Sequence, residues 1–184
     1  MSIKVESLTQ RTAIIAVFTA ACIASNYILL GIVNVKFMDL IIFIAGYIFG
    51  PVTGASIGVL TWLIYGTLNP YGFSLPILAA TASGETLYGI IGGVLGYKSK
   101  KCASINLTEN LKFAIIGFLL TFVYDQYTNI ISGLMVGIPI SVALISGIPF
   151  SIVHELSNAA FFFVGVSPSI SVIGRLFLDG SKHE

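Results

Sequence analysis

The sequence predicts an all-α integral membrane protein, a bundle of six transmembrane helices with both termini in the cytoplasm. Of its 184 residues, 56% are hydrophobic and only 9% are charged, whereas about a quarter of the residues in an ordinary soluble domain are charged. A soluble fold of this size has too little interior to bury so much apolar surface. Since a spanning helix needs about 20 mostly apolar residues, the length allows six or seven crossings and almost no extramembrane domain.

Polar and turn-forming residues divide the chain into six apolar segments. The separators are Asn34 with Lys36, Gly50-Pro51, Asn69-Pro70-Tyr71-Gly72, the polar loop 98–110, and Gly137-Ile138-Pro139. The segments predict a single domain over residues 1–184, with helices at 11–30, 37–50, 52–68, 74–97, 111–136 and 139–165. Residues 166–184 are expected to form a tail on the cytoplasmic surface.

The first two segments need separate arguments. Arg11 precedes the first apolar run, as in a signal peptide, but the run continues to Leu30 and is long enough to span, so we expect a retained helix. The segment 37–50 would rise only about 20 Å as a helix, less than the roughly 30 Å of a hydrocarbon core. Three arrangements are open for it: shielding by neighbouring helices, extension toward Val33, or a partly re-entrant path.

The basic residues orient the bundle. With the N-terminus inside, only Lys36 falls on the outer side. Eight basic residues fall on the inner side: Lys4, Arg11, Lys98, Lys100, Lys101, Lys112, Arg175 and Lys182. This bias follows the positive-inside rule. It predicts an even number of crossings of the cell membrane, with both ends of the chain in the cytoplasm.

Small residues recur at every fourth position, and residues four apart share a helical face. Ala16, Ala20 and Ala24 form such a stripe on the first segment. A stripe of this kind lets another helix approach closely in lipid, so it indicates either packing against the protein's own helices or a docking face for another subunit. A larger set of glycines favours close packing of the second, third and fourth helices: Gly46, Gly50, Gly54, Gly58, Gly89, Gly92, Gly93 and Gly96.

Ionisable residues inside the apolar segments gather near one depth. Such residues are costly in a membrane and usually face the interior of the bundle. Counted along their segments, Glu85, Asp125, His154 and Glu155 all fall near the middle of the membrane. Glu155 points about 100° away from His154 on the same helix, so we favour His154 as the central residue.

Helical neighbours extend these groups into a candidate ligand pocket. Aromatic faces stack on ring compounds, and amides and carboxylates hold ring nitrogens, so such a pocket suits a small polar heterocycle. The predicted substrate-binding residues are Trp62, Tyr65, Glu85, Tyr88, Asp125, Asn129, His154 and Asn158. A structural role is the alternative: the amides and tyrosines could bond between helices, Trp62 could pack, and His154 could pair with a buried carboxylate.

The sequence carries no motif for catalysis or metal binding. The run His154-Glu155-Leu156-Ser157-Asn158 resembles a zinc-protease helix, but Asn158 stands where the second histidine ligand is needed. There is no nucleophile elbow and no phosphate-binding Gly-Lys-Ser/Thr run. Cys22 and Cys102 have no metal or redox spacing. We therefore expect a protein that is not an enzyme, without metal, cofactor or disulfide and, lacking a basic tract, without a nucleic-acid partner.

Two motifs resemble those of a known family. The run Gly50-Pro51-Val52-Thr53-Gly54-Ala55-Ser56-Ile57-Gly58 is similar to the Gly-Pro-x-x-Gly-x-x-x-Gly turn in the substrate-binding S components of energy-coupling factor (ECF) transporters. The alanine stripe resembles the Ala-xxx-Ala motif on the first helix of that family. The size, the six helices and the inside termini also match, so the resemblance covers nearly the whole chain.

The resemblance implies a high-affinity membrane subunit that binds a vitamin or vitamin precursor in a cavity open to the outside. Such a subunit would dock through Ala16, Ala20 and Ala24 onto a membrane coupling subunit, which joins two cytoplasmic ATPase subunits. Toppling of the S component in the lipid bilayer would carry the ligand inward. ATP hydrolysis would then belong to the partners, which fits the lack of an ATPase motif in this chain.

The polar groups also indicate a class of ligand. Acidic and aromatic side chains, with one histidine and two asparagines, favour a thiamin-like or aminopyrimidine ligand. No buried arginine or lysine is evident for a carboxylate such as that of biotin or pantothenate, although Lys36 and Asp39 at the outer rim weaken that exclusion. Riboflavin, pyridoxine, another cofactor precursor and a queuosine-type base stay open.

Two other classes of function are alternatives. A self-sufficient proton-coupled secondary transporter would relay protons through Glu85, Asp125 and His154 and would take up a small polar solute alone. A small membrane enzyme acting on lipid would lose its turnover when Asp125 or His154 is replaced.

Overall fold

A computed structural model describes the fold of residues 7–70, 72–99 and 105–180, with side chains described as far as Ile173. The helices in these ranges are α1 (Leu8–Ile28), α2 (Met38–Phe49), α3 (Pro51–Leu68), α4 (Leu75–Lys98), α5 (Leu107–Val136) and α6 (Ile140–Gly180). Five of them are long and apolar enough to cross a membrane, and α2 is shorter. The predicted all-α membrane bundle of six helices is therefore confirmed, with five of the six long enough to span.

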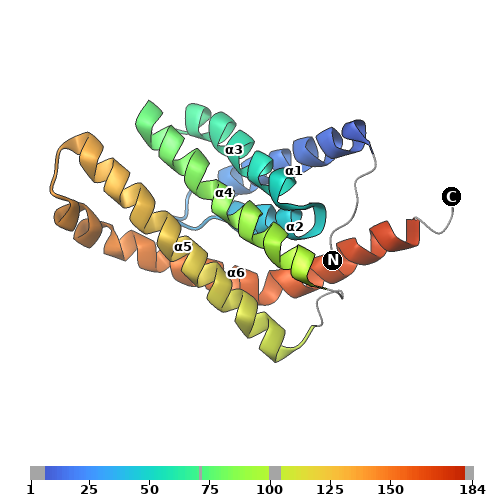
Figure 1. The fold of residues 1–184 in the computed structure, drawn as a ribbon. Helices are drawn as coiled ribbons and strands as arrows, with labels where there is room; N and C mark the ends of the chain where they lie inside the picture. The colour runs from blue at the N-terminus through green and yellow to red at the C-terminus, as the bar shows by residue number, and fades with distance from the viewer. Residues whose placement is uncertain (1–6, 71, 100–104, 181–184) are drawn as a thin grey trace.

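The ends of the helices collect at two ends of the bundle (Figure 1). The start of α1, the end of α4 and the start of α5 lie at one end, on the right of the view, and the α3–α4 and α5–α6 turns lie at the other. The first of these ends carries Arg11, Lys98 and Lys112. It is the end that the positive-inside rule assigns to the cytoplasm, and this orientation stays a prediction.

Helix α1 lies at the edge of the bundle and buries only one face. Ser7 caps its first turn by accepting a 3.1 Å hydrogen bond from the backbone N–H of Gln10. The buried residues Thr19, Cys22 and Asn26 follow a spacing of three and four, so they share one side of the helix. Cys22 is a free thiol; Cys102 lies outside the described residues, so the expected lack of a disulfide stays a prediction.

Three glycines bring the backbones of α2, α3 and α4 into contact. A Cβ on Gly54 would lie 2.7 Å from the Cα atoms of both Gly46 and Gly89, and a Cβ on Gly46 would overlap the carbonyl oxygen of Gly89. No side chain fits between these helices. Gly50 ends α2 with a φ of 95°, a conformation that glycine adopts at little cost, and Pro51 then begins α3. The expected close packing of these helices is confirmed.

Helix α2 is the innermost element, and all but one of its 12 residues are buried. At about 1.5 Å per residue it rises roughly 18 Å, too little to span. It contacts α1, α3, α4 and α6. Of the three arrangements considered for this segment, the structure shows shielding by neighbours. Met38 and Asp39, the first two residues of α2, are buried, so the start of α2 lies in the interior and not at a surface.

Helices α5 and α6 form a long hairpin. Asn106 caps α5 by accepting a 2.9 Å hydrogen bond from the N–H of Glu109, and Gly137 ends the helix in the left-handed conformation with a φ of 75°. Helix α6 then runs for 41 residues through Pro149 and Pro168.

The expectation of a surface tail from residue 166 is wrong for the described part of that segment. Val166, Ser167 and Ile170 are buried within the continuing helix α6. Proline is tolerated inside membrane helices because neighbouring groups satisfy the freed backbone, so Pro168 does not end the helix. Residues 181–184 of the expected tail lie outside the described residues.

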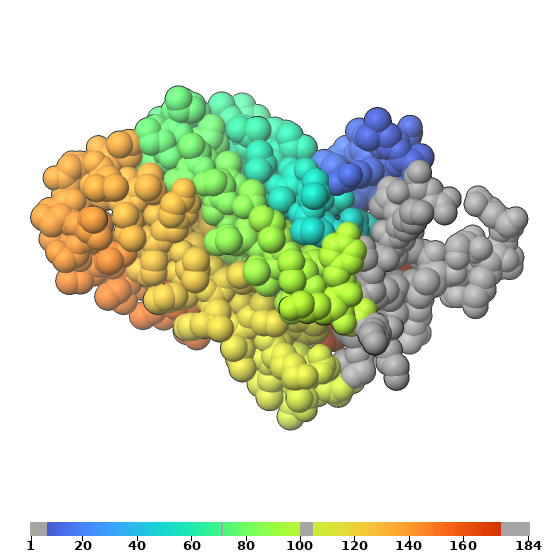
Figure 2. All heavy atoms as spheres, in the orientation of Figure 1, coloured from blue at the N-terminus to red at the C-terminus, as the bar shows by residue number. Residues whose placement is uncertain are grey.

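The outer faces of the bundle are apolar. In Figure 2 the atoms of α4 and α5 form a continuous surface across the face shown. On α5 the exposed residues Leu111, Ile115 and Leu119 recur every four positions and so form one stripe. An uninterrupted apolar stripe of this kind is the surface that a lipid bilayer solvates.

Candidate ligand-binding site

A histidine between two carboxylates lies at the centre of the bundle. His154 on α6 places Nδ1 2.9 Å from Oδ1 of Asp125 on α5 and Nε2 2.8 Å from Oδ2 of Asp39 on α2. All three side chains are buried. In the imidazolium form both ring N–H groups donate, one to each carboxylate, and the positive charge offsets part of the two negative charges. The histidine thus links the α5–α6 hairpin to α2, which is far away in the sequence.

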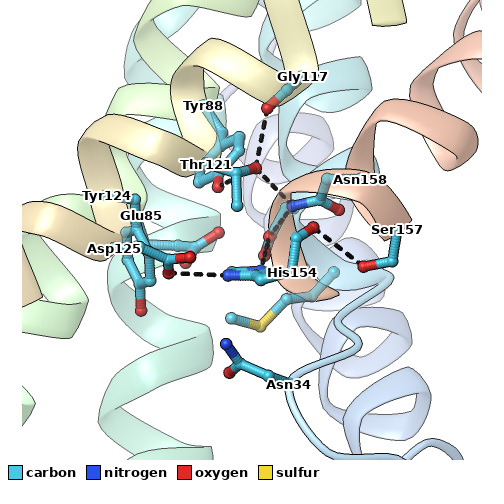
Figure 3. A network of polar contacts seen from close by, with 12 residues as sticks. Asn34, Glu85, Tyr88, Gly117, Thr121, Tyr124, Asp125, His154, Ser157 and Asn158 are labelled. Carbon is cyan, nitrogen blue, oxygen red and sulfur yellow. Dashed lines mark hydrogen bonds and ion pairs between the residues drawn. The ribbon is translucent and has the colours of Figure 1, made fainter. Parts of the chain in front are cut away.

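Asn158 extends this network one turn along α6 from His154. Its Nδ2 donates hydrogen bonds to Asp39 Oδ2 at 2.6 Å and to Thr121 Oγ1 at 2.8 Å. The Tyr88 hydroxyl donates to the same threonine oxygen at 3.0 Å, and Thr121 donates in turn to the Gly117 carbonyl at 2.8 Å. Figure 3 shows these groups converging between α4, α5 and α6. Helix α4 thereby joins the three helices that His154 connects.

Glu85 is fully buried on α4 beside the same network. The indole Nε1 of Trp62 on α3 donates a 2.9 Å hydrogen bond to Glu85 Oε2. Among the described residues, three carboxyl oxygens accept no hydrogen bond from another type of group: Asp39 Oδ1, Glu85 Oε1 and Asp125 Oδ2. The carboxyl groups of Glu85 and Asp39 lie within hydrogen-bonding reach of each other. Buried acceptors of this kind are costly to leave unpaired. Of the three residues, Asp125 is the one that lines a cavity.

A cavity of about 440 Å³, here called the central cavity, lies beside Asp125. The loop 29–37 covers it, and α3, α4, α5 and α6 form its walls. Its polar and aromatic lining residues are Asn26, Asn34, Lys36, Trp62, Tyr65, Thr81, Tyr124, Asp125, Thr128, Asn129, Ser132, Phe150 and Ser151. The volume and the mixture of aromatic and polar groups are typical of a small-molecule site.

A second cavity of about 420 Å³, here called the turn cavity, adjoins the first on the side of the α3–α4 turn. It is lined by Asn69, Phe73 and Ser74 among others. The two cavities share five lining residues, Lys36, Trp62, Tyr65, Ile77 and Thr81. These shared side chains form the boundary between the two spaces.

Lys36 places a positive charge on that boundary. Its Nζ lies 5.1 Å from the centre of the Trp62 ring and 5.4 Å from that of Tyr65, which is cation–π range. Burial lowers the pKa of the Lys36 ammonium below its ordinary range, and the nearby carboxylates, Asp39 first, oppose this shift. Lys36 lies in the loop 29–37, between two helices of the bundle.

The eight predicted substrate-binding residues fall into two groups. Trp62, Tyr65, Asp125 and Asn129 line the central cavity. The other four do not line it but are buried in the polar network behind it: Glu85, Tyr88, His154 and Asn158. The pairing of His154 with Asp125, weighed as an alternative from the sequence, is present at 2.9 Å.

A model of the family described as "ECF-type riboflavin transporter, S component" matches residues 6–168. The chain belongs to this S-component family. No curated protein and no solved structure shows a significant match to it. The resemblance drawn from the sequence motifs is therefore confirmed.

This S component is a multi-pass protein of the cell membrane and the substrate-binding subunit of a vitamin transporter. S components are transport subunits and not enzymes, and they work with a membrane coupling subunit and ATPase subunits. In the described part of the chain, no group of three or more histidine, cysteine, aspartate or glutamate side chains is placed to hold a metal ion.

The sequence misplaced one residue of this S component and missed several others. Asp39 was expected at the outer rim, but it is 1% exposed and bonds to His154 and Asn158. Counting from a membrane surface failed because α2 starts in the interior. Thr128 and Ser132 lie three and seven positions after Asp125, so helical spacing could have identified them. Asn26, Lys36, Thr81 and Ser151 belong to elements whose position only the tertiary fold determines.

The alanine stripe of α1 lies on the surface of this S component. Ala16, Ala20 and Ala24 are all exposed, as are their neighbours Val17 and Ala21. The first of the two sequence interpretations, packing against the protein's own helices, requires these residues to be buried. Their exposure leaves a smooth helical face available to another membrane helix.

Proposed function

We propose that this S component binds its vitamin in the central cavity, with the ligand ring on Trp62 and Tyr65 and a ring N–H donated to Asp125. The observation that carries the proposal is Asp125: this residue lines the cavity, and one oxygen of its buried carboxylate is held by His154 at 2.9 Å. A fixed acceptor of this kind specifies the position of a donor on the ligand.

The four buried residues behind the cavity act in this proposal through the four that line it. Glu85 orients the indole of Trp62, and His154 orients the carboxylate of Asp125. Asn158 and Tyr88 hold Asp39 and Thr121, which complete the network. Site residues whose own positions are fixed by hydrogen bonds lose little freedom when a ligand binds, and this favours high affinity.

Riboflavin is the ligand that we propose, since the family description names it. The thiamin-like ligand favoured by the sequence rested on acidic groups that could balance a cation. In the structure those groups have protein partners: His154 lies against Asp39 and Asp125, and Glu85 accepts from Trp62. A neutral ring with imide N–H and carbonyl groups fits the remaining donors and acceptors, and thiamin is the competitor that a test must include.

The exposed stripe Ala16, Ala20 and Ala24 is the proposed docking face for the membrane coupling subunit, which in turn would carry the two cytoplasmic ATPase subunits. The ligand cavity and the stripe belong to different surfaces. Ligand binding is then a property of this chain alone, and sustained uptake needs the partners.

Calorimetric titration of the purified protein with riboflavin and with thiamin tests the ligand, together with native mass spectrometry for a retained small molecule. Riboflavin should bind tightly, and Asp125→Asn should weaken it by about tenfold or more. Ser157→Ala is the control, since the Ser157 hydroxyl bonds only to the backbone of its own helix. Binding of neither vitamin, with no retained molecule, would contradict the proposal. Uptake by the protein alone, driven by an inward proton gradient across vesicles, would favour the secondary transporter instead.

A further inference from the structure

The aromatic surface that a ligand ring would use already carries a positive charge. The Lys36 ammonium lies 5.1 Å and 5.4 Å from the ring centres of Trp62 and Tyr65. These two rings meet edge to face, with centroids 5.8 Å apart and planes at 68°. Both side chains are buried and Lys36 is half-buried. A ring that stacks on either aromatic face must therefore lie close to the ammonium.

Lys36 lies on the boundary between the central and turn cavities, so a ligand in either space meets it. Both cavities are lined by Lys36, Trp62 and Tyr65. Among the described residues that line the two cavities, Lys36 and Asp125 are the charged ones. The balance of charge in the site therefore depends on one cation and one carboxylate.

The groups around the cavities would be acidic without Lys36. Asp125 lines the central cavity, and Asp39 and Glu85 lie in the network behind it, with His154 as the only basic side chain of that network. Three carboxyl groups against one imidazole would attract a cationic ligand. Lys36 adds a second positive charge and so weakens this preference.

We propose that Lys36 determines the charge of the ligand that this S component accepts: it admits neutral rings and excludes cationic ones. The inference rests on the proposed function, in which the ligand ring stacks on Trp62 and Tyr65. A cationic ring there, such as the thiazolium of thiamin, meets the like charge of the Lys36 ammonium, which lies 5.1 Å from the centre of the Trp62 ring, and repulsion of this kind is a common source of specificity. A neutral ring meets an ammonium that can donate hydrogen bonds to its carbonyl oxygens.

The test compares the affinities of riboflavin and thiamin for the wild type, Lys36→Met and Lys36→Arg, each purified in detergent. Methionine keeps most of the length of the side chain and removes the charge, and arginine keeps the charge. Lys36→Met should strengthen thiamin binding and weaken riboflavin binding, so that the ratio of their Kd values changes by about tenfold or more. Lys36→Arg should leave the ratio within about twofold of the wild type. Lys36→Gln is a second neutral variant should Lys36→Met fold poorly.

Three results would overturn the inference in distinguishable ways. An unchanged ratio in both neutral variants would show that Lys36 does not select by charge, while the proposed function stands. Preference of the wild type for thiamin over riboflavin would refute charge exclusion and leave a vitamin-binding subunit. Binding of neither vitamin by any variant would remove the proposed function and the inference together.

Discussion

The Nε2 atom of His154 on α6 lies 2.8 Å from Oδ2 of Asp39 on α2, although 115 residues separate them in the sequence. Both side chains are 1% exposed. In the interior of a membrane protein there is no water to replace such a contact. The pair, with Asp125 on the other side of the imidazole, is the polar core on which the candidate site depends.

Replacing His154 with glutamine should destabilise the protein and weaken ligand binding. The substitution removes the only cation between two buried carboxylates, and breaking a buried ion pair in this way costs about 3–5 kcal/mol. Thermal unfolding in detergent and ligand titration measure the two effects. Ser157→Ala, on the same helix, should change neither, and equal stability of the two variants would show that the histidine is not needed for charge balance.

Trp62→Phe should weaken ligand binding while the protein stays folded. Phenylalanine keeps a ring for stacking but cannot donate to Glu85 Oε2, which leaves a buried acceptor without its 2.9 Å partner at a cost of about 1–3 kcal/mol. Calorimetric titration gives the affinity. Tyr27→Phe is the matched control, since it removes an exposed hydroxyl whose partner is the Leu68 carbonyl; a comparable loss in both variants would argue against a specific role for the indole N–H.

Ala20→Leu should block assembly and leave ligand binding intact. The larger side chain stands on the exposed face of α1, where overpacking against a partner helix costs about 1–3 kcal/mol, or about a ten- to hundredfold loss of affinity. Co-purification with the coupling and ATPase subunits measures assembly. Ala79→Leu places the same change on an exposed position of α4 and should assemble normally. Loss of ligand binding in Ala20→Leu would point to internal packing instead.

Gly89→Ala should destabilise the bundle more than Gly31→Ala. A Cβ on Gly89 would lie 2.8 Å from the Cα of Gly54 and would overlap the neighbouring backbone of α3, whereas a Cβ on Gly31 meets nothing within 4 Å. Overpacking a close contact costs about 1–3 kcal/mol or more. Thermal unfolding of the two variants checks the difference, and similar melting temperatures would mean that the helices can separate without cost.

The discrimination between thiamin and riboflavin should depend on pH through Lys36. The ammonium is charged below its pKa, which burial lowers, so the exclusion of thiamin should be strong at low pH and relax as the pH rises through that pKa. The titratable groups near Lys36 on the other elements are Asp39, Glu85 and Asp125, with Tyr65 and Tyr124 in the same cavity lining. His154 lies behind Asp125 and is bonded to it. Lys36→Met isolates its effect: a pH dependence that persists in this variant would belong to one of those groups.

The course of the chain was predictable because its breaks carry local signals. Gly50-Pro51 and Gly137 each mark a turn whose backbone requires them. The end of α6 was not predictable, since Pro168, which would end a helix in water, lies inside a continuous helix in a membrane protein. A local signal is therefore reliable here only where the backbone conformation itself demands the residue.

The sequence predicts how deep in the membrane the site residues lie, but it does not predict whether each side chain faces the cavity or another side chain. Helical spacing places Asp125 and Asn129 on one face, and both line the central cavity. The same reasoning placed His154 and Asn158 together, but it could not show that they face Asp39 and not a ligand. The start of α2 lies in the interior, and only the tertiary fold reveals this, so Asp39 was wrongly assigned to the outer rim.

The glycine contact between α2, α3 and α4 has a consequence for how such a protein can diversify. Gly46, Gly54 and Gly89 have no room for a larger side chain. We therefore expect these three positions to stay glycine. The side chains that line the central cavity come mostly from the loop 29–37, α5 and α6. The residues that would set ligand preference are therefore different from the glycines that hold the helices together. Proteins of this kind can change ligand through substitutions in the cavity while the glycine contact stays the same.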